Sequence, residues 1–189
     1  MAEITIQVST AVVATYGFSR FSKIVDVGGG NGALILSILK VHPQMSGVLF
    51  DLPYVVEDAQ KHIKAAGLTG RCAVVAGDFF VYVPSGGDAY ILKNIIHDWD
   101  DERALKILQN CRRAMAENGK LLLVEGVIPP GNEPSFGKLV DLNMLVMAGG
   151  GEHTEAEYRA LFAAAGFTLT NVVPLQSPFS FSVIEGVRA

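Results

Sequence analysis

Short apolar runs of strand length recur along the chain and are separated by segments with helical spacing. The runs are Lys23–Val27, Gly47–Phe50, Cys72–Ala76, Asp88–Leu92, Lys120–Glu125, Thr168–Val173 and Phe181–Ile184. Strands that alternate with helices predict an α/β fold, a mostly parallel seven-stranded sheet with helices on both faces. The segment between the last two runs is too short for a parallel crossover, so we expect the last strand to be antiparallel to its neighbour.

Helix signals occupy the segments between these runs. The predicted helices cover Ala33–Leu39, Tyr54–Ala66 after Pro53, a segment from Asp100 or Asp101 to about Ala116, and a segment from the capping box Thr154–Glu157 to Gly166. Residues 1–16 are expected to form a helical lead-in, although Ile4, Ile6 and Val8 alternate as in a strand. Residues 17–189 are expected to form one domain. Prolines and a glycine between Ile128 and Pro134 predict a surface loop.

Composition narrows the class of protein. Half of the 189 residues are hydrophobic and 18% are charged, which is typical of a globular domain. The net charge of −4 argues against a nucleic-acid partner. No apolar run approaches the ~18 residues of a membrane span, and the N-terminus lacks the basic region of a signal peptide. We therefore expect a cytoplasmic protein in which Cys72 and Cys111 are buried, reduced thiols. The histidines and cysteines show no metal-ligand spacing, so no metal is predicted.

A glycine cluster follows the first predicted strand and precedes a predicted helix. This arrangement presents backbone N–H groups to a nucleotide-like ligand. Gly28, Gly30 and Ala33 fit a dinucleotide fingerprint, whereas Gly28, Gly30 and Gly32 fit the turn of methyltransferases that use S-adenosylmethionine. Asp51 ends the next apolar run, where either ligand needs an acid for its ribose hydroxyls. The glycine spacing alone leaves both ligands open.

Polar residues follow several other strands at the edge where α/β proteins place their sites. Asp78 and Phe79 suit an adenine, through a carboxylate for the exocyclic amine and an apolar surface for the ring. His97 is the best candidate for a general base, because an imidazole with its ordinary pKa of ~6.5 is mostly neutral at pH 7. Glu125 and Glu152 are available to hold its other ring nitrogen. The alternative is that His97 only packs near the next helix.

Four further residues have two readings each. Asp98 either contacts the ligand or caps the helix that follows. Trp99 is interpreted as core or as a wall under the loop, with a ligand contact as the alternative. Met144 and Met147 stand at helical spacing and are either core or an adaptable apolar wall for an aromatic substrate.

Five motifs together resemble a known family. They are Asp26-Val-Gly-Gly-Gly-Asn-Gly, Phe50-Asp51-Leu52-Pro53, Gly77-Asp78-Phe79-Phe80, the stretch from Leu92 to Asp101, and Gly150-Gly151-Glu152-His153-Thr154. In this order they are similar to the caffeate- and isoflavone-type O-methyltransferases of plants and their microbial relatives. The resemblance extends from about Tyr16 to the C-terminus. His153 departs from it, since the family has an arginine there, and Gly151 replaces the family's lysine.

The resemblance implies a class I, Rossmann-like methyltransferase fold, with S-adenosylmethionine as the cofactor and a small hydroxylated aromatic molecule as the expected substrate. The cofactor site would comprise Asp26, Gly28, Gly30, Asp51, Leu52, Asp78, Phe79 and Lys93. The residue that matches His97 deprotonates the substrate hydroxyl, and those that match Glu125 and Glu152 flank it. Met144 would border the substrate, and we add Asp98 and Met147. Full-length relatives are homodimers through an N-terminal helical domain, which we expect to be absent here.

Three other functions compete with methyl transfer. The first is a member of this family that binds S-adenosylmethionine and catalyses hydroxylation or decarboxylation instead. A non-catalytic binding module is a second alternative, favoured by the expected lack of the N-terminal domain. A nicotinamide-dependent dehydrogenase is the least supported, because it explains Asp51 but gives no reason for Asp78 or for the surroundings of His97.

Overall fold

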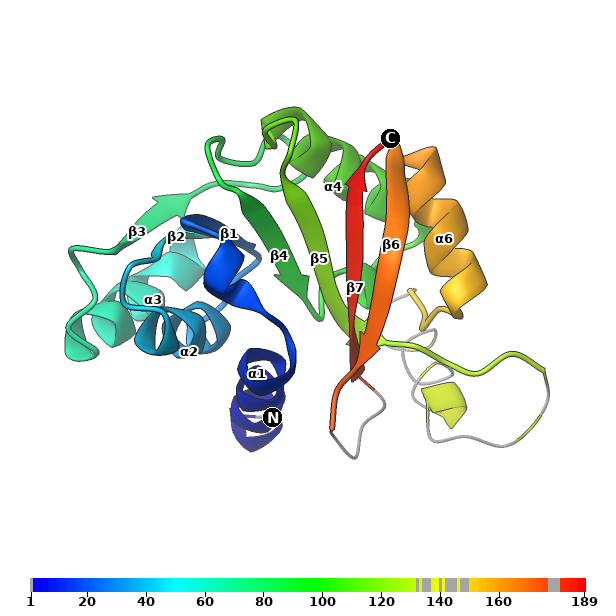
Figure 1. Ribbon diagram of the computed structural model, residues 1–189, viewed down its shortest axis with the longest axis horizontal. Helices are drawn as coiled ribbons and strands as arrows, with labels where there is room; N and C mark the ends of the chain where they lie inside the picture. Colours follow the sequence, from blue (N-terminus) through cyan, green and yellow to red (C-terminus); the bar gives the residue numbers. More distant parts are fainter. Residues whose placement is uncertain are drawn as a thin grey trace.

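A seven-stranded sheet runs through the molecule in the order β3-β2-β1-β4-β5-β7-β6 (Figure 1). The structure is a computed structural model that describes residues 2–131, 133, 137–139, 141, 146, 150–176 and 181–189, with side chains from residue 5 onward. The strands are β1 (Lys23–Val27), β2 (Ser46–Asp51), β3 (Cys72–Ala76), β4 (Ala89–Lys93), β5 (Lys120–Gly126), β6 (Phe167–Pro174) and β7 (Phe181–Arg188). Strands β1 to β5 pair in parallel, and β7 is antiparallel to both β5 and β6. The predicted fold class and the antiparallel last strand are confirmed.

Helices cover the two faces of this sheet with separate hydrophobic cores. They are α1 (Ala2–Thr15), α2 (Ala33–Val41), α3 (Pro53–Ala65), α4 (Asp101–Ala114) and α6 (Glu155–Ala164), with the short 3-10 turns η1 (Phe18–Arg20) and η2 (Ile96–Asp98). Val8, Leu34 and Val56 bring α1, α2 and α3 into one core, while Ile107 and Phe162 bring α4 and α6 into the other (Figure 1). None of the helices described here is long and apolar enough to span a bilayer.

The last strand is longer than its apolar pattern predicts. The expected end at Ile184 was wrong, because β7 continues through Glu185 and Gly186 to Arg188. Gly186 lacks a Cβ where the ring of Phe162 packs, since a Cβ there would lie 2.4 Å from Phe162 Cε1. A charged residue and a glycine therefore interrupt the hydrophobic pattern without interrupting the strand.

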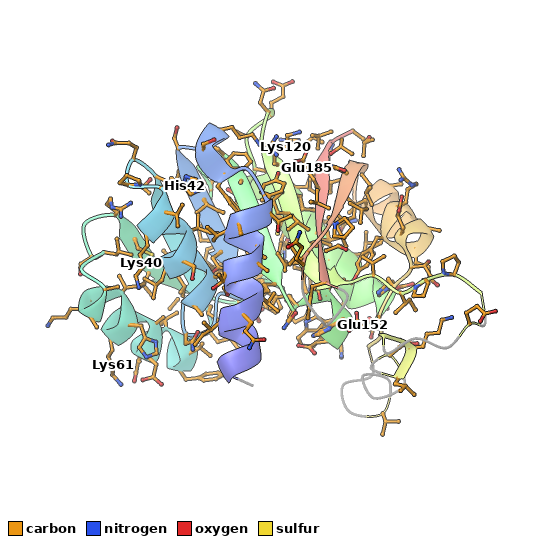
Figure 2. All side chains as sticks on the ribbon, turned by 60° about the horizontal axis from the view of Figure 1, so that its bottom comes forward. Lys40, His42, Lys61, Lys120, Glu152 and Glu185 are labelled. Carbon is orange, nitrogen blue, oxygen red and sulfur yellow. The ribbon has the colours of Figure 1, made fainter. Side chains whose placement is uncertain are left out.

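Glu185 is the centre of a polar cluster that joins the segment following α1 to the sheet. Its carboxylate accepts hydrogen bonds from Tyr16 and Arg20, from Lys120 Nζ at 3.0 Å and from Thr170 Oγ1 at 3.0 Å. These partners hold the pKa of Glu185 at about 2, against the effect of its burial, which alone would raise it. Figure 2 shows Lys120 and Glu185 together at one end of the sheet, with Glu152 toward the other end. The cluster therefore lies at the end of the sheet opposite to the carboxyl ends of the parallel strands, where the site is expected.

Candidate active site

The glycine turn between β1 and α2 has the backbone that the sequence predicts. Gly28, Gly30 and Gly32 have φ angles of +69°, +56° and +86°. Residues with a Cβ rarely adopt this backbone conformation. A Cβ on Gly28 would also lie 2.4 Å from Ile95 Cδ1, so the end of that side chain would have to shift. The end of β2 fixes the turn, since Asp51 Oδ2 accepts from Gly30 N at 2.8 Å. The turn and the predicted ribose acid are therefore in direct contact.

A cavity of about 420 Å³ lies beside this turn. Its lining residues are Thr5, Asp26, Gly28, Gly29, Gly30, Asn31, Ala33, Leu34 and Lys93. Asp26 is 1% exposed, and its Oδ2 has no hydrogen-bond partner. Burial raises the pKa of Asp26 to about 7, although the charge of Lys93 opposes this rise. The cavity thus combines a buried carboxylate with an ammonium group.

Thr5 is a lining residue that lies far from every motif in the sequence. It reaches the cavity because α1 packs against the face that carries α2. No motif marks Thr5, and only this packing brings the lead-in helix to the glycine turn.

The predicted adenine residues lie next to the turn. Phe79 Cε1 is 3.6 Å from the position that a Cβ on Gly28 would take. The ring of Phe79 packs edge-on against Phe80 and Trp99, with centroid separations of 4.9 Å and 6.1 Å. Asp78 Oδ1 accepts from Phe80 N at 2.8 Å, so the carboxylate also closes its own turn. Trp99 accordingly forms part of an aromatic wall behind Phe79.

Three carboxylates surround His97, which lies in η2 just after β4. Its Nδ1 is 3.0 Å from Glu152 Oε1 and 3.7 Å from Glu125 Oε2, and its Nε2 is 3.5 Å from Asp98 Oδ1. A carboxylate only accepts, so Nδ1–H donates to Glu152 and Nε2 is left to take up a proton. The side chains of His97, Glu125 and Glu152 are 13%, 0% and 5% exposed.

These carboxylates change the charge of the histidine. Burial lowers the pKa of His97, but its hydrogen bond to Glu152 and the charges of Glu125, Glu152 and Asp98 outweigh this effect and raise the pKa to about 9. The expectation of a mostly neutral imidazole at pH 7 was therefore wrong for this structure. The reason is that the carboxylates expected to orient the ring also stabilise its charged form.

Asp98 does not cap α4. The N-cap is Asp100, whose side chain accepts from Arg103 N at 2.9 Å. Asp98 is instead 46% exposed beside His97 Nε2, which leaves its predicted ligand contact open. Met144 and Met147, the other predicted substrate residues, lie outside the described residues.

Two glycines allow Glu152 to reach the histidine. A Cβ on Gly150 would lie 2.2 Å from His97 O, and a Cβ on Gly126 would lie 2.5 Å from Glu152 Oε2. The backbone of Glu152 is held as well, because its N–H donates to Asp141 Oδ1 at 2.8 Å. The two glycines before Glu152 are visible in the sequence. The sequence does not show, however, that this loop passes η2 closely enough to require a residue without a Cβ.

Known proteins are similar to this chain in sequence and in fold. A model of the O-methyltransferase domain family matches residues 1–168. Phenazine O-methyltransferase PhzM of Lysobacter antibioticus is 51% identical over 181 residues, which are 96% of this chain and 52% of that protein. The crystal structure of LaPhzM has a TM-score of 0.92 at 50% identity and covers 98% of this chain and 55% of its own.

A third relative was solved with ligands. The O-methyltransferase NcsB1 from neocarzinostatin biosynthesis, in complex with S-adenosylmethionine and 2-hydroxy-5-methyl naphthoic acid, has a TM-score of 0.87 at 33% identity. The match covers 100% of this chain and 57% of that one. The chain spans about half the length of the curated relatives that it matches.

Proposed function

The chain belongs to the O-methyltransferase domain family, and we propose that it transfers the methyl group of S-adenosylmethionine to a phenolic hydroxyl of a small molecule. The observation that carries this proposal is the hydrogen bond between His97 Nδ1 and Glu152, which leaves Nε2 as a base. The base lies at the same edge of the sheet as the glycine turn, because both follow parallel strands.

The cavity beside the turn fits the amino-acid end of S-adenosylmethionine. Asp26 Oδ2 is buried without a partner, which is unfavourable unless a donor is supplied. The α-amino group of the cofactor would supply that donor, and Lys93 would face its carboxylate. Asp51 would hold the ribose, with Leu52 beside it, and Asp78 and Phe79 would hold the adenine. When bound, the cofactor supplies a methyl group that is already electrophilic, so the protein must position the acceptor and remove its proton.

His97 is matched to the acidity of a phenol. A phenol has a pKa of ~10, close to the pKa of about 9 that the surrounding carboxylates give His97, so proton transfer to Nε2 is nearly balanced. Glu152 and Glu125 then stabilise the imidazolium that forms. This raised pKa keeps most of His97 protonated at pH 7 in the free protein, so methyl transfer should become faster as the pH rises toward 9.

Relatives support an aromatic acceptor. One relative is named as a phenazine O-methyltransferase, and another was solved in complex with a naphthoic acid; phenazine and naphthoic acid are both aromatic. We place the acceptor beside Nε2 of His97, where Asp98 is exposed, and keep Met144 and Met147 as predicted borders. We also propose that the lead-in helix belongs to the same domain as residues 17–189, because Thr5 lines the cavity.

Titration and turnover together test the proposal. The chain and its His97→Ala variant are titrated calorimetrically with S-adenosylhomocysteine and with NAD, and methylated products are sought by mass spectrometry against a panel of phenols. We expect His97→Ala to abolish methylation while S-adenosylhomocysteine binding stays within about twofold. Lys61→Ala, which alters an exposed ion pair on α3, is the control for substitution itself.

Three results would contradict the proposal. Binding of NAD without binding of S-adenosylhomocysteine would favour the nicotinamide-dependent dehydrogenase. S-adenosylhomocysteine binding without any methylated product would favour a binding module. Equal loss of binding and methylation in His97→Ala would make His97 a structural residue.

A further inference from the structure

Asn94 has an unusual backbone for a residue with a side chain. Its φ is +56°, and among the described residues every other positive φ belongs to a glycine. Asn94 lies between Lys93, the last residue of β4, and the segment that carries His97. Left-handed backbone in a residue with a Cβ costs conformational energy and concentrates at functional sites.

The next residue has the opposite hand. Ile95 has φ −116° and ψ −49°, in the right-handed region. Two successive residues of opposite hand turn their N–H groups toward one point and form a nest that binds an anion. Here the anion is Glu125, whose Oε1 accepts from Ile95 N at 2.8 Å and from Ile96 N at 2.9 Å. Glu125 is completely buried and therefore needs these donors.

The side-chain oxygen of Asn94 does not explain its presence. Asn94 Oδ1 is buried and accepts no hydrogen bond, so that oxygen makes no polar contact to be preserved. The backbone N–H of Asn94 donates to Val124 O at 3.2 Å, which continues the pairing of β4 with β5. The turn at Asn94 thus joins the end of the sheet to the nest that holds Glu125. Asparagine is one of the few residues other than glycine that adopts this conformation readily.

We propose that Asn94 is a positioning residue, whose left-handed backbone aims the N–H groups of Ile95 and Ile96 at Glu125 and thereby sets the charge of His97. The role of that charge in catalysis rests on the proposed function, but the coupling of Asn94 to His97 does not.

The charges around Glu125 give the direction of the effect. Burial raises the pKa of Glu125 to about 7, and His97 and the two N–H groups lower it. Without the nest the pKa of Glu125 would rise further, so more of Glu125 would be neutral in the pH range where His97 titrates and its attraction for the imidazolium would weaken. The pKa of His97 would then fall. Glu152 and Asp98 also face His97, and the phenol of Tyr158 on α6 lies within the field of Glu125 and Glu152 and stays protonated.

The test compares variants that differ in their tolerance of left-handed backbone. The imidazole of His97 is titrated by NMR in the cofactor-free protein as wild type, Asn94→Gly and Asn94→Val. Glycine adopts the conformation freely, whereas a β-branched valine strongly resists it. We expect Asn94→Gly to keep the pKa of His97 within about 0.3 units and Asn94→Val to lower it by about one unit. Asn94→Ala replaces Asn94→Val if the valine variant does not fold.

A double variant separates the nest from other effects. Glu125→Gln alone should also lower the pKa of His97, and adding Asn94→Val should change it by less than about 0.3 units more, because the carboxylate through which Asn94 acts is gone. An unchanged His97 pKa in folded Asn94→Val would overturn the proposal, and so would an equal fall in Asn94→Gly. The titration needs no methyl transfer, so its outcome is independent of whether the chain is active.

Discussion

Replacing Glu152 by glutamine tests how the carboxylates control the base. Glutamine has the same shape as glutamate, and its side-chain oxygen can still accept from His97 Nδ1 across the observed 3.0 Å. The substitution therefore removes the charge and leaves the hydrogen bond. Any change in the titration of His97 would then report electrostatics rather than a lost contact.

The structure gives the size of the effect. The pKa of His97 rises from its ordinary 6.5 to about 9 although burial lowers it. That net rise favours the imidazolium by about 3 kcal/mol, so Glu152, Glu125 and Asp98 together outweigh the effect of burial. Glu152 acts through a hydrogen bond and through its charge, and the substitution removes the charge, so we expect Glu152→Gln to lower the pKa of His97 by about one unit.

The assay is the pH profile of kcat/KM. A base with a raised pKa is neutral only at high pH, so the wild-type rate should rise up to about pH 9. In Glu152→Gln the rise should end at pH 8 or below, with a lower plateau because the imidazolium is less stabilised. Glu155→Gln, which alters an exposed pair with Arg159 at the start of α6, is the matched control. A rise that ends at the same pH in Glu152→Gln and wild type would refute the reasoning.

Two other predictions concern the glycine turn and the polar cluster. Gly28→Ala should weaken S-adenosylhomocysteine binding at least tenfold by calorimetry, because its Cβ would lie 2.4 Å from Ile95 Cδ1 at a φ of +69°. Gly30→Ala, which has open space at its Cβ, should lose less, and equal losses would show that only backbone strain matters. Glu185 has a folded pKa of about 2, below its ordinary 4.5, so its stabilisation is present above pH 4.5 and is lost toward pH 2. Glu185→Gln should lower the urea midpoint at pH 7 more than at pH 3, and an equal loss at both would contradict the ionic role.

The sequence was sufficient for features that repeat or that obey local rules. The apolar runs located the strands, and the capping box at Thr154 is present with both of its hydrogen bonds. The end of β7 was missed because the apolar pattern has no means to show that Glu185 is satisfied by Lys120 and Thr170. Periodicity describes which face is buried, but it does not describe polar groups that pair across the sheet.

The site was predictable as a set of residue types, and its electrostatics were not. Strand-end position nominated His97 and Glu125, and Glu152 was nominated from its place before the helix that Thr154 caps; the structure brings the three together. Their distances decide the charge of the imidazole, and these distances depend on the close passage of Gly150 over the backbone of His97. Asn94 escaped notice for the same reason, because a left-handed backbone in a residue other than glycine has no reliable sequence signal.

The raised pKa of His97 determines the pH range in which the carboxylates accelerate the reaction. An ordinary imidazole would take a proton from a phenol of pKa ~10 at a cost of about 5 kcal/mol, whereas a base of pKa about 9 does so for about 1 kcal/mol. At pH 7 the stronger base loses most of this gain, because it must first be deprotonated. The benefit therefore grows with pH and is complete only above pH 9. Glu152 and Glu125 are thus expected to increase the rate most in alkaline solution, where Glu152→Gln should differ most from the wild type.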